Sequence, residues 1–573
     1  MSNPPDRVSL VIGVTGHRDL VPTEVPAITL QVERFFDTLE AEFPDLPIMV
    51  LTPLAEGADR LVGDVARSRG YDVFNLLPMP ASIYELDFEG ESLDEFAEHK
   101  GAGEVIELPL VDGSSVEDLA HPGLARDLQY AQLGVYLAAH SHILLAVWDG
   151  KPSQATGGTA QVIEFHQRDI VELLAEHQQR SHLDFADDES DLVFHIVVSR
   201  TETGGPTDGL VAGETQWLSR DDQQPRTDEL PSRYRLVFQR MAEFNRDLAS
   251  ASGDYTDALA PDQETAMENP SAQPIASLYG GADELAISYG RRFQRSIIAM
   301  YSTVLFGGLS FIMYADFVGQ DEMIFGYLAF MLIGPGIYLF MRNRQWERKY
   351  LDYRVLAEGL RVQFYWALAG VDMVNPSRFS HDSFLQGRDL ELGWIRNIMR
   401  YSGFRADSES HKGQPPIRLD LVRRYWVGDD GEGQLGYYGV AADQKMRRLI
   451  ITSGIATACF IAGIFVVILL AFFQNSIGGS LSNYMIALMG LLPIMSGLRL
   501  TYSSRMGEQE LVAQYAHMKR IFSNAKRLLD NAETQSEAQE ILRELGEAAL
   551  DENAQWILRQ RERPLPGGEL MQG

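Results

Sequence analysis

The sequence predicts an α/β doubly wound parallel-sheet domain, followed by an α-helical membrane domain with four transmembrane helices. Two observations support this prediction. Short apolar runs alternate with segments of helical period over residues 1–200. Farther along, the stretches 296–341 and 449–498 are each long enough to cross a bilayer twice, because one crossing needs about 20 apolar residues.

Six short runs of apolar or β-branched residues are typical of buried parallel strands. They cover residues 8–14, 47–54, 71–79, 104–110, 142–148 and 194–199. Helical-period segments lie between several of them, at residues 24–42, 58–69, 123–140 and 159–179. Strands that alternate with helices indicate a parallel sheet covered on both faces. We expect its ligand crevice at the carboxyl ends of the strands.

The segments between these two predicted domains carry weaker patterns. Residues 201–275 are poor in apolar pattern, and we expect a linker or irregular insertion there with one helix over 232–249. Residues 276–295 look like a helix that leads into the first span. We expect a cytosolic subdomain over 371–448 and a C-terminal helical tail over 531–573.

Four membrane spans are expected, and they form two hairpins. The spans cover residues 296–314, 323–341, 449–473 and 483–498. The short turn inside each hairpin has no Lys or Arg, whereas basic residues flank the other span ends. By the positive-inside rule, both hairpins then hang from the cytosolic side of a plasma membrane, with both termini in the cytosol. Buried helices of a soluble protein are the alternative, and the one-sided charge disfavours it.

The membrane half contains an internal repeat. Each copy is a two-span hairpin with a proline in its second span, Pro335 in one copy and Pro493 in the other. A cytosolic amphipathic helix follows each hairpin, at residues 350–370 and 511–530, so that the copies end at 370 and 530. Such repeats are typical of transporters and pores. Duplication for packing alone is the alternative.

Composition excludes some partners. The formal net charge of −31 over 573 residues argues against a nucleic-acid polymer, since binding to its backbone needs a basic surface. Cys459 is the only cysteine and lies in the third span. One chain therefore has no internal disulfide and no thiolate metal site, which suits a reducing cytosol.

The first strand-like run ends in a loop with residues suited to a phosphate. Gly13 and Gly16 let the backbone approach a ligand closely, and Thr15 supplies a hydroxyl. Arg18 can donate two hydrogen bonds to a phosphate. His17 is a further candidate contact, and its alternative role is a loop residue paired with a backbone carbonyl.

The second run ends in a loop that opens a helix. Gly57 sits at the turn, and the helix N-terminus behind it favours an anion. Glu56 is a candidate for ribose hydroxyls. Asp59 and Arg60 complete this set of candidates. Their alternative roles are a helix N-cap for Asp59 and an ion pair with Asp64 for Arg60.

The third loop joins a buried strand to the start of a helix. It begins with Asp149 and Gly150 directly after the strand. It ends with Gly157, Gly158 and Thr159, which present backbone N–H groups and the positive end of a helix dipole to a phosphate.

Glu164 follows within the next turn or so of that helix. If the chain only binds its ligand, it needs no catalytic residue, and we assign none. If the chain is an enzyme, Glu164 is the candidate, because its carboxylate can reach a ribose or a glycosidic bond. Its alternative role is an ion pair with Arg168 four residues on.

Together these loops resemble the SLOG superfamily, a Rossmann-like group. It contains DNA-processing protein A, the "lonely guy" phosphoribohydrolases, and nucleotide-sensing domains of some bacterial defence proteins and melastatin-type channels. The similar motifs are VTGHRD (14–19), LAEGADRL (54–61) and GGTAQVIE (157–164), within residues 7–200. The resemblance implies a small nucleotide messenger as ligand, a cyclic nucleotide or an ADP-ribose derivative, with no cofactor and no metal.

One departure from the phosphoribohydrolase motif bears on hydrolysis. That motif begins Pro-Gly-Gly and has two acidic positions, whereas this chain has Thr156 before Gly157 and a single acid, Glu164. The departure weakens the expectation of hydrolysis more than the expectation of binding.

The membrane half is similar to SLATT-type effectors, two-span modules fused to or encoded beside SLOG sensors in bacterial nucleotide-signalled antiviral systems. The similarity lies in a hairpin followed by a helix such as 353–361, here present twice. It implies an abortive-infection-type effector in the bacterial inner membrane that forms a pore or disrupts the bilayer as a homo-oligomer. Two alternatives stay open: a membrane-anchored phosphoribohydrolase or nucleotide hydrolase, and a nucleotide-regulated transporter.

Overall fold

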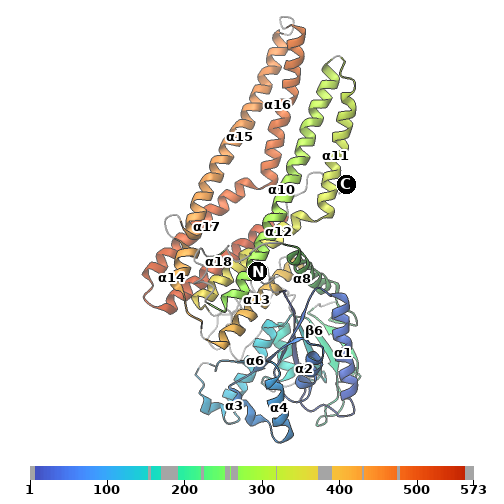
Figure 1. Cartoon of the computed structure of the whole chain (residues 1–573), viewed down its shortest axis with the longest axis vertical. Helices are drawn as coiled ribbons and strands as arrows, with labels where there is room; N and C mark the ends of the chain where they lie inside the picture. The colour runs from blue at the N-terminus through green and yellow to red at the C-terminus, as the bar shows by residue number, and fades with distance from the viewer. Residues whose placement is uncertain are drawn as a thin grey trace. The chain divides into compact units, whose positions relative to one another are not determined.

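The computed structural model divides the chain into two compact units (Figure 1). The sheet unit comprises Met1–Gly281 and Gly359–Ile417, and the hairpin unit comprises Ala282–Glu358 and Arg418–Gly573. The structure describes residues 7–111, 113–152, 156–168, 191–220, 225–251, 259, 269–317, 319–371, 390–413, 415–428, 432–473 and 478–561.

The sheet unit is built on a mixed, mainly parallel sheet in the order β4-β3-β2-β1-β5-β6-β7-β8. Its strands are β1 (Leu10–Gly16), β2 (Ile48–Thr52), β3 (Asp72–Leu77), β4 (Glu104–Glu107), β5 (Ile143–Trp148), β6 (Val193–Val197), β7 (Thr215–Leu218) and β8 (Arg226–Thr227). The six predicted strands are confirmed as β1 to β6, and all of their pairings are parallel. The last two strands, β7 and the edge strand β8, pair antiparallel and were not predicted.

The strand order reverses direction beside β1. The chain builds β2, β3 and β4 on one side of β1, then returns to place β5 on its other side. Ile12 pairs with Ile143 of β5, and Leu10 pairs with Ile48 of β2. Such a reversal opens a crevice at the carboxyl ends of the two central strands.

Helices cover both faces of the sheet, which confirms the doubly wound fold. The helices before β6 are α1 (Val25–Glu42), α2 (Ala58–Ser68), α3 (Ala81–Tyr84), the 3₁₀ turn η1 (Glu85–Asp87), α4 (Glu91–Gly101), α5 (Val116–Leu119), α6 (Leu124–His140) and α7 (Thr159–Arg168). A Cβ at Gly13 would overlap Ser141 at the end of α6, and a Cβ at Gly16 would overlap Ala58 of α2. These glycines stand three residues apart, so they face opposite sides of β1. The rest of the predicted helix 159–179 lies outside the described residues.

The segment 201–275 contributes to the sheet unit. It supplies β7, β8 and α8 (Ser232–Ser250), which confirms the helix expected over 232–249. In α8, Asn245 accepts a hydrogen bond from Val8 N (3.0 Å) and donates to Val8 O (2.9 Å). Phe238 packs edge-on against Phe43. These long-range contacts, which local composition does not reveal, make part of the expected linker an integral piece of the fold.

Part of the segment 371–448 also belongs to the sheet unit. Its helix α13 (Gly393–Lys412) follows the 3₁₀ turn η3 (Leu390–Leu392) and is buried along most of its length. His142 accepts from Val11 N (3.1 Å) and donates to the Asn397 carbonyl (2.9 Å), so it links β1 to α13. The boundary therefore differs from the separate subdomain that we expected. Residues 372–389, 414 and 429–431 of that segment lie outside the described residues.

The hairpin unit consists of helices. They are α10 (Ala272–Asp316), α11 (Met323–Asn343), α12 (Trp346–Ala369), α14 (Leu419–Leu421), the π-helical turn η4 (Val422–Val427), α15 (Gly433–Phe473), α16 (Gly479–Arg505), α17 (Glu508–Asn531) and α18 (Gln535–Arg561). The boundaries between the two units fall inside α10 and α12 and after Ile417. Pro335 and Pro493 lie inside α11 and α16.

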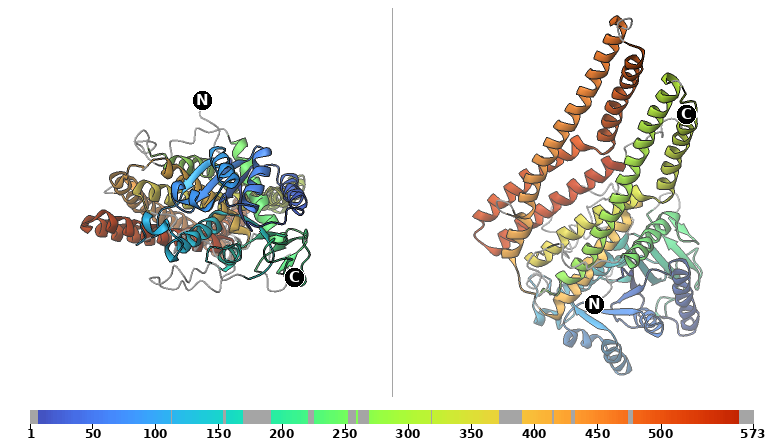
Figure 2. Two further views of the ribbon diagram at one scale, coloured as in Figure 1. Left: turned by 90° about the horizontal axis from the view of Figure 1, so that it is seen from below. Right: turned by 45° about the horizontal axis from the view of Figure 1, so that its top comes forward.

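Among the described residues, four helices are long and apolar enough to cross a membrane, and they contain the four predicted spans. The chain is therefore a membrane protein by the length and composition of these helices. The right-hand view in Figure 2 shows the two helices of each hairpin side by side, α10 with α11 and α15 with α16.

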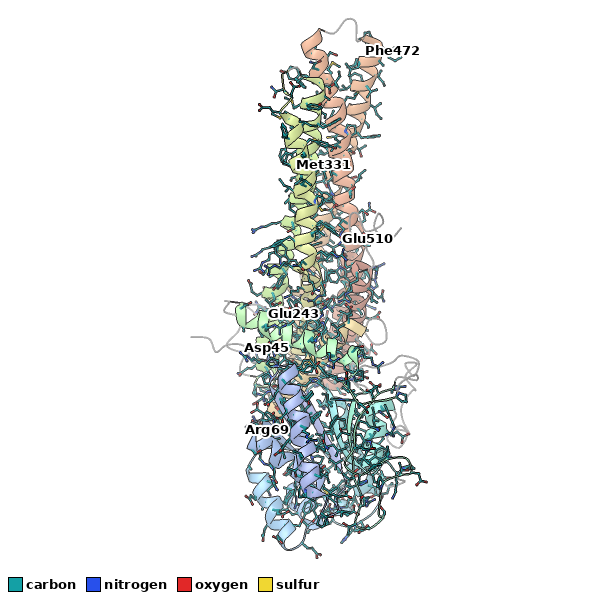
Figure 3. All side chains as sticks on the ribbon, turned by 90° about the vertical axis from the view of Figure 1, so that its right-hand side faces the viewer. Asp45, Arg69, Glu243, Met331, Phe472 and Glu510 are labelled. Atoms are coloured by element: carbon teal, nitrogen blue, oxygen red, sulfur yellow. The ribbon has the colours of Figure 1, made fainter. Side chains whose placement is uncertain are left out.

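The hairpin helices carry large apolar side chains on their outer surfaces. Met331 and Phe472, labelled in Figure 3, are 55% and 79% exposed. Where helices meet, small residues allow close approach: a Cβ at Gly334 would overlap Thr303 Oγ1, and a Cβ at Gly490 would press on Ile312. Apolar surface of this kind suits contact with lipid.

The two hairpins continue into the next helix through the same kind of junction. Gln345, between α11 and α12, has φ 51°, and Gly507, between α16 and α17, has φ 58°. Gln345 N donates to Arg342 O and Gly507 N donates to Ser504 O, both at 3.1 Å. This shared geometry is consistent with the repeat seen in the sequence.

Candidate ligand-binding site

A cavity of about 480 Å³ lies at the carboxyl ends of β1, β2 and β5, at the reversal of strand order. All three predicted loops reach it. The predicted candidates that line it are Thr15, Gly16, His17, Arg18, Asp59, Asp149, Gly157, Gly158 and Thr159. Residues of α6 and of the segment after β6 complete the wall. The volume falls in the range of small-molecule sites.

His17 and Asp149 form the contact between the first and third loops. His17 Nε2 lies 3.1 Å from Asp149 Oδ1, and both side chains are largely buried. Asp149 Oδ1 also accepts a hydrogen bond from Lys151 N (3.0 Å). Burial lowers the pKa of His17 below its ordinary 6.5, although Asp149 opposes this shift. The imidazole is therefore mainly neutral at pH 7, and its partner is a carboxylate rather than a backbone carbonyl.

Arg18 is an accessible cation of the site, beside Lys151 and Arg200 in the same wall. Its side chain is 44% exposed, and Nη2 lies 4.0 Å from Asp87 Oδ2. Asp87 is also held by Arg126 and by the Tyr130 hydroxyl, which both donate to it. Burial alone would lower the pKa of Arg18, but Tyr84, Tyr130 and nearby carboxylates raise it. The guanidinium is thus permanently charged and still has room for an anion.

The second loop brings the N-terminus of α2 against the first loop. Gly57 has φ 73°, and a Cβ there would overlap the carbonyl of Arg18. Ala58 N donates to His17 O (3.2 Å). As a result Asp59, in the first turn of α2, lines the cavity with 3% of its surface exposed. The cap position belongs to Gly57, so Asp59 is not the N-cap.

Asp59 carries an unusual carboxyl group. Burial raises its pKa to about 8, while Arg18, the Ala55 N–H and Arg60 act in the opposite direction. Among the described residues, Asp59 Oδ1 has no hydrogen-bond partner. A buried polar atom without a partner is rare and calls for an explanation.

The third loop positions the N-terminus of α7 at the cavity. Gly157 has φ 75°, and a Cβ there would overlap Tyr130 of α6, so only glycine fits this turn. Gly157 N donates to Gln161 Oε1 (2.5 Å), and Gly158 O accepts from Val162 N (3.0 Å). The first N–H groups of a helix have no intrahelical acceptor, and the dipole there favours an anion. Residues 153–155 of this loop lie outside the described residues.

Some predicted candidates do not line the cavity. Gly13, Gly57 and Gly150 permit close packing of neighbouring segments instead. Glu56 accepts a hydrogen bond from Ser92. Glu164 is exposed on α7, and the side chain of Arg168 lies outside the described part.

Arg60 has a structural role behind the cavity. It is buried and donates to Leu54 O (3.3 Å), Ser92 Oγ (3.1 Å) and Glu95 Oε2 (2.9 Å). Asp64, the alternative partner we considered, pairs with Arg67 at 2.9 Å. Leu54 itself has φ 61°, a conformation that L residues rarely adopt, and the Arg60 contact helps to hold it.

Several lining residues were missed because no motif marks them. Tyr84 and Tyr130 come from α3 and α6, and Trp148 ends β5. Arg200 lies beyond β6 and donates through Nε to Asp19 Oδ1 (2.8 Å). Only the rule that carboxyl ends of parallel strands share one edge could have suggested Arg200 from the sequence.

Comparison of the chain with models of protein families, with curated proteins and with solved structures finds no match.

Proposed function

We propose that this protein is a ligand-controlled membrane effector. The cavity of the sheet unit binds a nucleotide-derived messenger, such as a cyclic nucleotide or an ADP-ribose derivative. The spans of the hairpin unit then form a pore or disrupt the bacterial inner membrane as a homo-oligomer, in an antiviral system of the abortive-infection type. Both termini lie in the cytosol in this proposal.

The observation that carries the proposal is the convergence of three loops on one cavity. Arg18 from the first loop and the N-terminus of α7 from the third both favour an anion. Tyr84, Tyr130 and Trp148 add aromatic surface on which a base can stack. Charged donors beside aromatic walls suit a phosphorylated nucleoside better than a simple ion.

Hydrolysis is less well supported than binding. The candidate catalytic carboxylate, Glu164, is exposed and does not line the cavity. Three acids do line it: Asp19 pairs with Arg200, Asp149 contacts His17, and Asp59 is almost fully buried. These pairings indicate that the paired carboxylates organise the loops. They argue against a role in attack on a glycosidic bond.

Control of the membrane part needs a connection between the units. The helices α10 and α12 each contain residues of both units, so they join the cavity-bearing unit to the spans covalently. A ligand can shift the spans between two states only if it binds those states with different affinity. We assign that coupling to these two helices.

The first test is a thermal-shift screen of the full chain in lipid nanodiscs. The panel comprises cyclic di- and trinucleotides, ADP-ribose, cyclic ADP-ribose and nucleoside monophosphates. A ligand at a hundred times its Kd stabilises the protein by about 2.7 kcal/mol. A ligand recovered unchanged supports a sensor, whereas a ligand cleaved to base and sugar phosphate supports the hydrolase.

Variants make this test specific to the cavity. Arg18→Ala and Gly158→Asp should abolish the shift while membrane insertion stays intact. The matched controls are Arg246→Ala, an exposed arginine of α8 paired with Asp45, and Gly101→Asp, where a side chain meets open space. A full response from either cavity variant would show that the ligand binds elsewhere. The active ligand is then tested for leakage of dye from liposomes that contain the protein.

A further inference from the structure

The cavity places a buried acid where an anion is expected. Asp59 lines the same cavity as Arg18 and the start of α7, and its side chain is almost fully buried. Its Oδ1 has no partner among the residues that the structure describes. Gly57 and Gly16 let α2 approach β1 closely enough to hold the carboxyl there.

An ionised carboxylate in this position would oppose the proposed ligand. Two negative groups in one poorly solvated cavity repel each other strongly, since the effective dielectric there is low. A carboxylic acid has the opposite effect, because its O–H donates a hydrogen bond to an oxyanion. The unpartnered oxygen then gains a partner when the ligand binds.

We propose that Asp59 serves this cavity as a protonated acid, which donates a hydrogen bond to a phosphate oxygen of the ligand. Binding of the anion therefore requires the proton on Asp59. This inference rests on the proposed function of the cavity, and it names the charge state in which the cavity accepts its ligand.

The neighbouring groups whose pKa values are shifted titrate outside the range from pH 7 to pH 9. Arg18 acts on the Asp59 carboxyl from the first loop, and its own pKa is raised above the ordinary arginine value. Arg60 is the next residue on α2. Burial raises the pKa values of Tyr84 and Tyr130 above 10, and burial lowers the pKa of His17 below 6.5. Asp87, on the far side of Arg18, is held by Arg126. Burial raises the pKa of Asp59 itself to about 8, inside this window.

The test uses inorganic sulfate, whose charge is constant from pH 6.5 to 9.5. Sulfate affinity is measured by thermal shift on the full chain in nanodiscs at constant ionic strength. Gly158→Asp provides the baseline for the general stabilising effect of sulfate on proteins. For the wild type we expect a constant Kd below about pH 7.5, rising toward tenfold for each pH unit above about 8. Calorimetry in two buffers of different ionisation enthalpy should show uptake of almost one proton at pH 9.

Two variants of α2 separate this role from a structural one. Asp59→Asn keeps a donor without a titrating group, so it should bind sulfate with little dependence on pH. Asp64→Asn, an exposed acid of the same helix, should keep the wild-type pH profile.

The proposal is overturned if wild-type affinity does not change between pH 6.5 and 9.5, or if no proton is taken up. Loss of binding in a folded Asp59→Asn also overturns it, because the amide N–H of Asn should replace the hydrogen bond that the acid donates. A wild type that binds no sulfate at any pH instead overturns the anion cavity itself.

Discussion

The two units use the same apolar residue types in opposite ways. In the sheet unit, Ile12 of β1 and Leu145 of β5 are fully buried against their own chain. In the hairpin unit, Leu332 of α11 is 67% exposed and Phe472 of α15 is 79% exposed. Burial removes a side chain from water in the first case, and lipid does so in the second. The comparison teaches that an exposed leucine on these helices suits the apolar interior of a bilayer better than it suits water.

The largest expected effect comes from the same substitution made in both units. Leu145→Ala should destabilise the sheet unit by about 2–5 kcal/mol, because it leaves a cavity in a packed core. Leu332→Ala should change stability by less than about 0.5 kcal/mol, because its side chain packs against little protein. Hydrogen exchange of peptides from β5 and α11 in the full chain measures both. Equal effects would contradict the difference between the units.

A charge on the outer surface of a hairpin should have the next largest effect. Leu332→Arg should cost about 2.5–3.5 kcal/mol of insertion free energy if this position sits near the centre of the bilayer. The expected result is less protein in the membrane fraction than for Leu332→Ala. Leu124→Arg, an exposed leucine of the sheet unit, is the control and should insert normally. Normal insertion of Leu332→Arg would place this surface away from lipid.

A smaller effect is expected at an ion pair that joins the two copies of the repeat in the hairpin unit. Arg505 at the end of α16 pairs with Glu347 at the start of α12, and both are shielded from water. Burial raises the pKa of Glu347, although Arg505 opposes this shift. A double-mutant cycle with Arg505→Gln and Glu347→Gln should give a coupling energy of about 0.5–3 kcal/mol, as for contacting residues elsewhere.

The cycle is measured by thermal unfolding in nanodiscs, with messenger-induced leakage as a second measurement. Arg424 and Glu432 form an exposed pair at 2.9 Å in the same unit and serve as the control. Exposed pairs contribute about 0–1 kcal/mol. A coupling energy no larger than that of the control pair would show that the buried contact does not hold the hairpins together.

The smallest expected effect is a pH dependence of stability. It should appear in the sheet unit, where His17 titrates, and not in the membrane span of α15. Because burial lowers the pKa of His17 in the folded state, the stability it contributes is present above pH 6.5 and is lost as pH falls below it. His17→Gln should therefore reduce the loss of stability between pH 7 and pH 5, by up to about 1.4 kcal/mol for each unit of pKa shift. Hydrogen exchange in α2 and β1 should report the change. Exchange in the span of α15, which has no Asp, Glu, His, Lys or Arg, should not.

Sequence patterns predicted the central strands and the spans because their signals are local. The strand 142–148 is a continuous apolar run, and the span 449–473 exceeds the length of a bilayer crossing. The edge strand β8 has two residues, too few for a periodic signal. The helix α13 was assigned to a separate subdomain because its burial arises from contacts with α6, α8 and β4, which are distant in the sequence.

The sequence predicted those parts of the candidate site that directly follow a strand and contain glycines. His17 and Asp149 were chosen from different loops, and the parallel topology brings them within 3.1 Å. Arg60 was chosen for its neighbours in the motif, yet its side chain points to Glu95 behind the cavity. A motif gives the residue types of a loop, whereas the side-chain direction depends on packing around it.

The sequence by itself determined that this chain has an α/β half and a membrane half, because composition and periodicity over short windows carry that information. It also identified the three loops that meet at one edge of the sheet, since parallel strands share their carboxyl ends. Only the tertiary structure decided the chemistry of Asp59. Its pKa depends on burial and on Arg18, Tyr84 and Tyr130, which come from separate segments of the chain. Charge states respond to the three-dimensional neighbourhood, and no local window of sequence contains that neighbourhood.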